Sequence, residues 1–178
     1  MSYLDGHEKN SSPSQFLVDN ISLLPRGKAL DMAMGSGRNA IYLANNGFEV
    51  EGVDISKNAV DSALQKAAEN EVTIQAKVVD LEQAYQIRPS FYDIIICFNY
   101  LQRSLIPQIN NGLKTCGMVV YETFTIDQPK FGKPNNLDYL LKYNELLDMF
   151  RDFRCLRYRE GIFENSRAIA SILAEKVR

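Results

Sequence analysis

The sequence predicts an α/β protein built on a doubly wound, mostly parallel seven-stranded sheet with an antiparallel C-terminal strand. First, short apolar runs of strand length alternate along the chain with segments of helical periodicity. Second, the run YDIIICF at 92–98 is apolar apart from Asp93, as expected of a strand covered on both faces. Third, only a short turn near 164–166 joins the last two predicted strands, so there is no room for a helical crossover and they should be antiparallel.

The first half of the chain supplies five elements: a helix within 12–24, a strand at 29–33, a helix at 39–46, a strand at 48–54 and a helix after 56. Pro25 stops the first helix, and Gly47 is the expected C-terminal stop of the second. Ser56 can cap the third helix. We expect that helix to bury one face, made up of Ala59, Val60, Ala63, Leu64 and Ala67.

The second half continues with strands at 72–79, 92–98 and 118–124, helices around 105–113 and at 137–150, and closing strands at 154–160 and 168–177. The segment 137–150, LDYLLKYNELLDMF, is predicted as one amphipathic helix from the spacing of its apolar residues. The connection 125–136 is long and contains two prolines, which is typical of loops that close over a site. We expect this loop and the N-terminal segment 1–24 to cover an acceptor pocket.

Composition favours one soluble, cytoplasmic domain over residues 1–178. The net charge is −2, so no basic surplus indicates nucleic acid. The three cysteines are far apart and odd in number, which is typical of reduced thiols. No run of residues is long and apolar enough for a membrane helix, and no His/Cys/Asp cluster suggests a metal.

A glycine-containing turn follows the first predicted strand. Gly35, Gly37 and Ala40 form a G-x-G-x-x-A spacing, which is typical of dinucleotide sites because glycine lets the backbone turn tightly against a ligand. Asp54 ends the next strand, about where an acid contacts ribose hydroxyls. Ligands of such sheets bind at the carboxyl ends of the strands, so the sequence predicts a nucleotide-like ligand there.

Asp31 and Asp80 distinguish between two cofactors. A carboxylate at the end of the first strand would repel the pyrophosphate of a nicotinamide cofactor. The same carboxylate would attract the ammonium group of S-adenosylmethionine, which has no pyrophosphate. Asp80, at the end of the third strand, can accept the adenine amino group, with the N–H of Leu81 beside it. The three acids together favour S-adenosylmethionine.

The motifs resemble those of class I S-adenosylmethionine-dependent methyltransferases over about residues 12–178. The first motif, Asp/Glu-x-Gly/Ala-x-Gly-x-Gly, reads DMAMGSG at 31–37, with Ala33 at the first glycine position. GVDIS at 52–56, VVDLE at 78–82, YDIIICFNYLQR at 92–103 and LKTCGMVVYETF at 113–124 resemble the later motifs. The resemblance implies a Rossmann-like fold with S-adenosylmethionine as cofactor and S-adenosylhomocysteine as product. It implies as cofactor-binding residues Asp31, Ala33, Gly35, Gly37, Arg38, Asn39, Asp54, Ile55, Asp80, Leu81 and Phe98.

Within this class, GSGRNAIYLANNGFEVEGVDIS resembles the small tellurite-resistance-type branch, whose members act on metalloid oxyanions or thiols. That branch carries a histidine–arginine pair in its late substrate region. Here the only histidine is His7. The branch resemblance therefore implies the fold and the cofactor, and not tellurite as the acceptor.

Methyl transfer is an in-line displacement that needs alignment and water exclusion more than acid–base chemistry. Candidate catalytic residues are Glu122, Tyr100 and Arg103, with Glu122 as a base or a cation-binding acid and Arg103 as an anion holder. A solvated loop acid and an exposed helix-start arginine are the simpler interpretations of these two. The arginines at 151, 154, 157 and 159 are interpreted as a solvated surface, and Cys97 and Cys116 as structural.

We therefore expect a methyltransferase that acts on a small-molecule acceptor. Two alternatives stay open at this point: a protein or RNA methyltransferase that works with a partner, and a regulatory module that binds the cofactor without catalysis. The sequence does not determine the acceptor or the oligomeric state.

Overall fold

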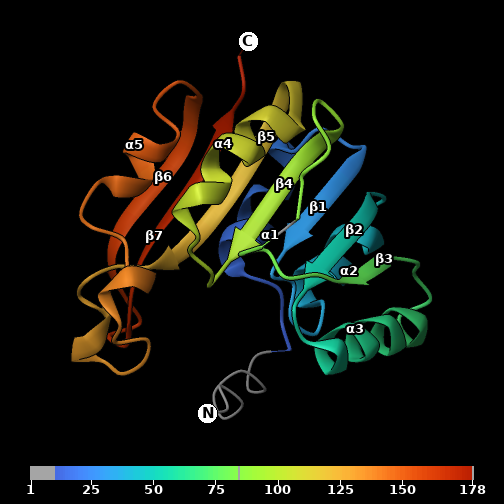
Figure 1. Ribbon diagram of the computed structural model, residues 1–178, viewed down its shortest axis with the longest axis horizontal. Coiled ribbons are helices and arrows are strands. Elements are labelled where there is room, and N and C mark those ends of the chain that lie inside the picture. Colours follow the sequence, from blue (N-terminus) through green and yellow to red (C-terminus); the bar gives the residue numbers. More distant parts are fainter. Residues whose placement is uncertain (1–10, 84, 178) are drawn as a thin grey trace.

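The computed structural model describes residues 11–83 and 85–177 and confirms the predicted architecture (Figure 1). One seven-stranded sheet has the order β3-β2-β1-β4-β5-β7-β6. The strands are β1 (Lys28–Met32), β2 (Glu49–Asp54), β3 (Gln75–Val78), β4 (Tyr92–Phe98), β5 (Leu113–Phe124), β6 (Arg154–Phe163) and β7 (Arg167–Glu175). Strands β1 to β5 run parallel, whereas β7 is antiparallel to both β5 and β6.

Helices cover both faces of the sheet (Figure 1). They are α1 (Gln15–Asn20), α2 (Arg38–Asn45), α3 (Lys57–Glu69), α4 (Ile106–Gly112) and α5 (Glu145–Met149). Short 3-10 turns occupy Ile21–Leu23, Arg103–Leu105, Gln128–Lys130 and Leu137–Tyr139. No helix in the described ranges is long and apolar enough to cross a membrane.

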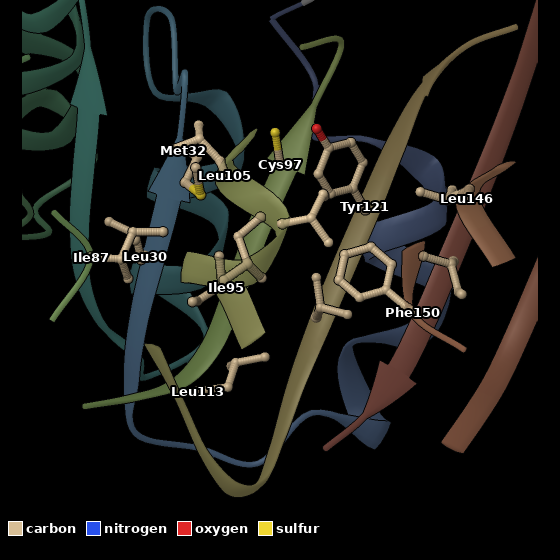
Figure 2. Close-up of a cluster of buried hydrophobic side chains, with 14 of the residues drawn as sticks. Leu30, Met32, Ile87, Ile95, Cys97, Leu105, Leu113, Tyr121, Leu146 and Phe150 are labelled. Carbon is tan, nitrogen blue, oxygen red and sulfur yellow. The ribbon is translucent and has the colours of Figure 1, made fainter. Parts of the chain in front are cut away.

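The central strand β4 is apolar from Ile94 to Phe98 because both of its faces are covered there. Ile94 and Ile96 pack into the hydrophobic cluster beneath α1, α2 and α3. Ile95 and Cys97, which alternate with them, pack into the cluster beneath α4 and α5 (Figure 2). The one acid of the strand, Asp93, lies near its start, where it is partly exposed and pairs with Lys114 at 2.9 Å.

The C-terminal hairpin agrees with the prediction from its short turn. Glu164 and Asn165 have φ of 53° and 51°, the left-handed values that a tight hairpin turn requires. Pairing of Phe163 with Arg167 starts the ladder, which places Arg159 opposite Ser171. This hairpin adds β7 to the edge of β5 and leaves β6 as the outer strand.

The predicted single helix at 137–150 is wrong. After the 3-10 turn Leu137–Tyr139 the chain is extended, and α5 begins only at Glu145. Leu141 donates its N–H to the carbonyl of Phe124 at 2.9 Å and accepts from the N–H of Ile126 at 2.9 Å. This strand-like pairing with the chain after β5 satisfies the backbone and buries Leu141, so tertiary contact prevails over the helical period.

Two smaller expectations also fail. Leu64 is 42% exposed rather than buried, because α3 faces the sheet with Val60, Ala63 and Ala67 and Leu64 lies about 100° around the helix from Ala63. The predicted strand at 72–79 begins only at Gln75, where pairing with β2 starts.

Candidate cofactor and acceptor site

The three predicted acids lie along one edge of the sheet. β1, β2 and β3 are adjacent and parallel, so their carboxyl ends meet at the lower edge in Figure 1. Asp31 lies in β1 beside Gly52 of β2, Asp54 lies at the end of β2 beside Val78 of β3, and Asp80 follows β3. The strand order reverses between β1 and β4, which is where sheets of this kind bind their ligands.

The turn after β1 is a run of left-handed backbone. Ala33, Gly35 and Gly37 have φ of 54°, 56° and 81°. A Cβ on Gly37 would lie 2.8 Å from the Cβ of Ala63, so glycine is required for α3 to pack against this turn. A Cβ on Gly35 would meet nothing within 4 Å. Gly35 therefore exposes bare backbone toward open space, where a ligand can approach it closely.

Asp54 is fixed by the turn that it faces. Its Oδ2 accepts the N–H of Gly35 at 2.8 Å and its Oδ1 accepts the N–H of Ser56 at 2.9 Å. Each carboxylate oxygen has a second lone pair, so the group can still accept ribose hydroxyls. The next residue, Ile55, is 67% exposed, which leaves a broad apolar side chain beside this carboxylate.

Asp80, after β3, is held in a comparable way. Its Oδ1 accepts the N–H of Glu82 at 2.9 Å and its Oδ2 accepts Nε2 of Gln83 at 2.8 Å. Leu81 is buried at 6% exposure. Asp80, Leu81 and Ile55 together could hold a flat heterocycle with an exocyclic amine.

Asp31 differs from the other two acids because it is fully buried. Its Oδ2 has no hydrogen-bond partner among the described residues. Burial raises the pKa of Asp31 to about 8, while the charge of Arg38 and the backbone N–H of Ala40 act in the opposite direction. A buried carboxyl group without a partner is costly, so this atom is suited to a cationic group of a ligand.

Glu122, on β5, is neither a solvated acid nor free. It is 2% exposed, and its Oε2 accepts the Ser171 hydroxyl at 2.6 Å and Nη2 of Arg159 at 3.1 Å. Its Oε1 lies 3.8 Å from Nη2 of Arg167. Glu122, Ser171 and Arg159 form a row across β5, β7 and β6, since Ser171 is the pairing partner of both other residues.

The two arginines beside Glu122 are supported by aromatic rings. The guanidinium of Arg159 lies 5.0 Å from the ring centroid of Phe16 and 4.7 Å from that of Phe163. Arg167 donates to the side-chain oxygen of Asn99 at 3.4 Å, at the carboxyl end of β4. The expectation that Arg159 belongs to a solvated surface is therefore wrong, although residues 151, 154 and 157 are exposed.

Arg38 joins the cofactor half of the site to this second half. Burial lowers the pKa of Arg38, and the charge of Arg167 adds to that effect, whereas Asp31 and Glu122 act in the opposite direction. Arg38 also donates Nη1 to the carbonyl of Ser12 at 2.9 Å. Three guanidinium groups and two carboxylates thus gather where β1, β4 and β5 end.

Two further residues predicted to bind the cofactor, Asn39 and Phe98, are buried. The Asn39 side-chain oxygen accepts the N–H of Ser14 at 2.8 Å, so α1 is tied to the start of α2. Phe98 ends β4 at 6% exposure. Residues 1–10 of the predicted cover segment, including His7, lie outside the described residues.

Tyr100 and Arg103, the other two candidate catalytic residues, make contacts that differ from those of Glu122. The Tyr100 hydroxyl is buried and has no partner in the part of the chain that the structure describes, while its carbonyl accepts the Tyr121 hydroxyl at 2.8 Å. Arg103 is engaged by Glu145 through Nε at 2.6 Å and by the carbonyl of Leu140 at 3.0 Å. Arg103 therefore fastens the chain before α5 to the start of α4, whereas Arg38, Arg159 and Arg167 are the arginines that gather around Asp31 and Glu122.

The loop 125–136 continues from the carboxyl end of β5. Its Phe131 is 38% exposed, and Lys130 pairs with Asp127 at 2.6 Å within the loop. Sequence reasoning missed Arg167, Ser171 and Ser14. The hairpin turn alone could have paired position 159 with 171, but the place of the hairpin beside β5 carries no local sequence signal.

Comparisons with known proteins show which family this chain resembles. The profile of the family described as "Tellurite resistance protein TehB" matches residues 4–171. Hemagglutinin 1 of Eikenella corrodens is 28% identical over 144 residues, which is 76% of this chain and 46% of that protein. A probable S-adenosyl-L-methionine-dependent methyltransferase TehB from Haemophilus influenzae is 25% identical over 155 residues, 83% of this chain and 53% of that protein. The chain thus spans about half the length of the curated relatives it matches.

Solved structures have the same fold. TehB from Haemophilus influenzae superposes with a TM-score of 0.75 at 22% identity, over 92% of this chain and 62% of that chain. Magnesium protoporphyrin IX methyltransferase ChlM from Synechocystis, solved with bound S-adenosylhomocysteine, superposes with a TM-score of 0.70 at 21% identity, over 90% and 78% of the two chains. The comparisons confirm the predicted class, its branch and S-adenosylmethionine as the cofactor of that class.

Proposed function

The chain belongs to the TehB family of class I S-adenosylmethionine-dependent methyltransferases, and from this premise we propose that it transfers the methyl group of S-adenosylmethionine to a small-molecule acceptor. The observation that carries the proposal is the fully buried Asp31, whose Oδ2 has no partner among the described residues. In this proposal, that atom accepts the α-ammonium group of the cofactor. A nicotinamide cofactor would instead bring its anionic pyrophosphate toward this carboxyl group, and the two would repel each other when Asp31 is ionised.

The remaining acids orient the cofactor in the same proposal. Asp54 accepts the ribose hydroxyls with the lone pairs that Gly35 and Ser56 leave unused. The adenine packs on exposed Ile55, and Asp80 accepts its amino group. Gly35 permits the backbone to approach the methionine part of the cofactor, since no atom of the described residues lies within 4 Å of the position of a Cβ there.

The acceptor binds on the other side of the strand-order reversal, near Asn99, Glu122 and Arg167. A lone pair of the acceptor forms the new bond to the methyl carbon, the carbon–sulfur bond breaks and its electron pair remains on sulfur. The step needs no proton transfer if the acceptor enters deprotonated. Glu122 is occupied by Ser171 and Arg159, so its role is to hold those groups rather than to remove a proton.

Charge indicates the kind of acceptor. The guanidinium groups of Arg38, Arg159 and Arg167 exceed the carboxylates of Asp31 and Glu122 in number, and the cofactor adds a sulfonium. An acceptor that is anionic or strongly electron-rich balances this excess and is held by charge-assisted hydrogen bonds. Methyl transfer then removes the sulfonium charge, which weakens the attraction for the product.

Two measurements test the proposal. Calorimetry should show binding of S-adenosylhomocysteine to the full chain, and a screen across thiols, metalloid oxyanions, carboxylates and small amines should release S-adenosylhomocysteine with at least one anionic acceptor. Tight NADH binding without S-adenosylhomocysteine binding would refute the cofactor assignment. Cofactor binding with transfer only to protein or RNA in a cell extract would replace the small acceptor with a polymer.

A further inference from the structure

We propose that Ser14 is a positioning residue that links the cofactor-binding helix α2 to the acceptor-side carboxylate Glu122, an inference that rests on the proposed function. The backbone N–H of Ser14 donates to the Asn39 side chain at 2.8 Å. Its hydroxyl donates to Oε1 of Glu122 at 3.4 Å. One buried residue thus contacts both halves of the site.

The conformation of Ser14 supports a role outside its own helix. Ser14 occupies the N-cap position of α1, where a serine hydroxyl ordinarily accepts an N–H from the first turn. Here the side chain makes no capping hydrogen bond and turns toward Glu122 instead. At 6% exposure it is removed from water. Substitution of this hydroxyl therefore removes no cap from α1.

A second residue of the same helix holds the partner of Glu122. Phe16 is 5% exposed, and its ring lies 5.0 Å from the guanidinium of Arg159, which pairs with Glu122 at 3.1 Å. Helix α1 therefore contacts both members of the Glu122–Arg159 ion pair. The chain just before α1 is held from the cofactor side, since Arg38 donates to the carbonyl of Ser12 at 2.9 Å.

This arrangement couples the two ligands. A cofactor that fixes the start of α2 also fixes Asn39 and Arg38, and through them Ser12 and Ser14. Ser14 and Phe16 then hold Glu122 and Arg159 in the arrangement that receives the acceptor. Coupling of this kind is reciprocal, so a change at Glu122 must alter affinity for the cofactor although Glu122 belongs to the acceptor side.

A double-mutant cycle on the full chain tests the link, with S-adenosylhomocysteine affinity measured by calorimetry. We expect Ser14→Ala and Glu122→Met each to weaken binding about 2- to 10-fold, the range for one buried hydrogen bond. The double variant should bind about as well as the weaker single variant, because both changes interrupt the same link. Gln15→Ala is the matched control, because Gln15 is exposed and bonds to Asp19, and should bind as the wild type does.

If Glu122→Met does not fold, Phe16→Leu takes its place, because this variant keeps the charge of Glu122 and removes the ring beside Arg159. We expect Phe16→Leu to weaken S-adenosylhomocysteine binding to a similar extent. Hydrogen exchange supplies a readout that a purely structural role would not change. S-adenosylhomocysteine should protect amides 14–20 and 120–124 in the wild type, and 120–124 should lose that protection in Ser14→Ala.

Two outcomes separate the possible failures. If the wild type binds S-adenosylhomocysteine but Ser14→Ala binds equally well, or the effects of the two substitutions multiply, the link through Ser14 is refuted and the proposed function stands. If the wild type does not bind S-adenosylhomocysteine at all, the proposed function is refuted and this inference with it.

Discussion

Replacing Asp31 with asparagine should stabilise the ligand-free protein at neutral pH and remove its cofactor affinity. Burial raises the pKa of this carboxyl from 3.8 to about 8. Between these values Asp31 is protonated in the folded chain and ionised in the unfolded one, so unfolding releases a proton. The stability from this group is complete below about pH 4 and is lost as pH rises toward about 8.

The magnitude follows from linkage. One released proton lowers the free energy of unfolding by about 1.4 kcal/mol per pH unit, so the wild type should lose about 2.7 kcal/mol between about pH 5.5 and 7.5 from this group. The Asp31→Asn variant does not titrate at this position. For a chain of this size, the melting temperature of the wild type should fall relative to the variant by roughly 5–10 °C over that interval.

Cofactor binding should show the opposite pH dependence. The ammonium group of S-adenosylhomocysteine favours ionised Asp31, so affinity should rise as pH increases toward 8, by up to about tenfold per unit. Calorimetry in buffers of different ionisation enthalpy should detect release of about one proton per ligand near pH 6.5. Thermal melts of the wild type and of Asp31→Asn at the same pH values measure the change in stability.

Two results would refute the role proposed for Asp31. Parallel melting curves of wild type and Asp31→Asn across this interval would show that Asp31 is ionised in the folded chain. Undiminished S-adenosylhomocysteine binding by Asp31→Asn would show that the carboxylate does not receive the ammonium group. Arg38 is the nearest charged group that opposes the shift, so Arg38→Gln should raise the pKa of Asp31 further and move the rise in affinity to higher pH.

Three further predictions concern the same edge of the sheet. Asp54→Ala should weaken S-adenosylhomocysteine binding about 10- to 150-fold by calorimetry, because a carboxylate hydrogen bond is worth about 1.5–3 kcal/mol; unchanged affinity would remove Asp54 from the site. Gly37→Ala should lower the free energy of unfolding by about 2–5 kcal/mol in denaturant melts, because φ is 81° there and the new Cβ would lie 2.8 Å from the Cβ of Ala63. Gly35→Ala should lower it by only about 1 kcal/mol but should remove most of the cofactor affinity. Equal losses of stability in the two variants would contradict this contrast. The Cys97→Ser, Cys116→Ser double variant should keep transfer activity, since burial raises the pKa of Cys97 to about 12 and keeps it a thiol; loss of turnover in a folded single variant would indicate covalent catalysis.

The sequence predicted those parts of the fold that depend on local pattern. The apolar run of β4 marked a strand buried on both faces, and Ile94 to Cys97 do alternate between the two hydrophobic clusters; Figure 2 shows Ile95 and Cys97 in one of them. The short turn at 164–166 was sufficient to predict the antiparallel hairpin. The segment 137–150 failed because its fate depends on backbone pairing of Leu141 with Phe124, a contact between positions that local periodicity cannot relate.

The same distinction between local pattern and long-range contact applies to the site. Asp31, Gly35 and Asp54 lie within two adjacent strands and the turn after the first, and parallel pairing alone brings them together. The acceptor side instead combines Ser14 of α1, Glu122 of β5, and Arg159 and Arg167 of the hairpin. Their proximity depends on where the hairpin pairs in the sheet and where α1 packs on its face, and no local sequence pattern predicts either.

This division has a consequence for how acceptor preference can change. Two of the cofactor acids are held by their neighbours in the chain or in the adjacent turn, Asp54 by Gly35 and Ser56 and Asp80 by Glu82 and Gln83, so substitutions in the hairpin leave these contacts undisturbed. The hairpin can therefore vary its side chains toward the acceptor while the cofactor remains the same. Two residues cross the boundary: Ser14, which joins Asn39 to Glu122, and Arg38, whose charge interacts with Asp31 on one side and with Glu122 and Arg167 on the other. A hairpin change that displaces Glu122 reaches the cofactor through α1 and through the charge of Arg38, so these residues determine how independently the two halves can change.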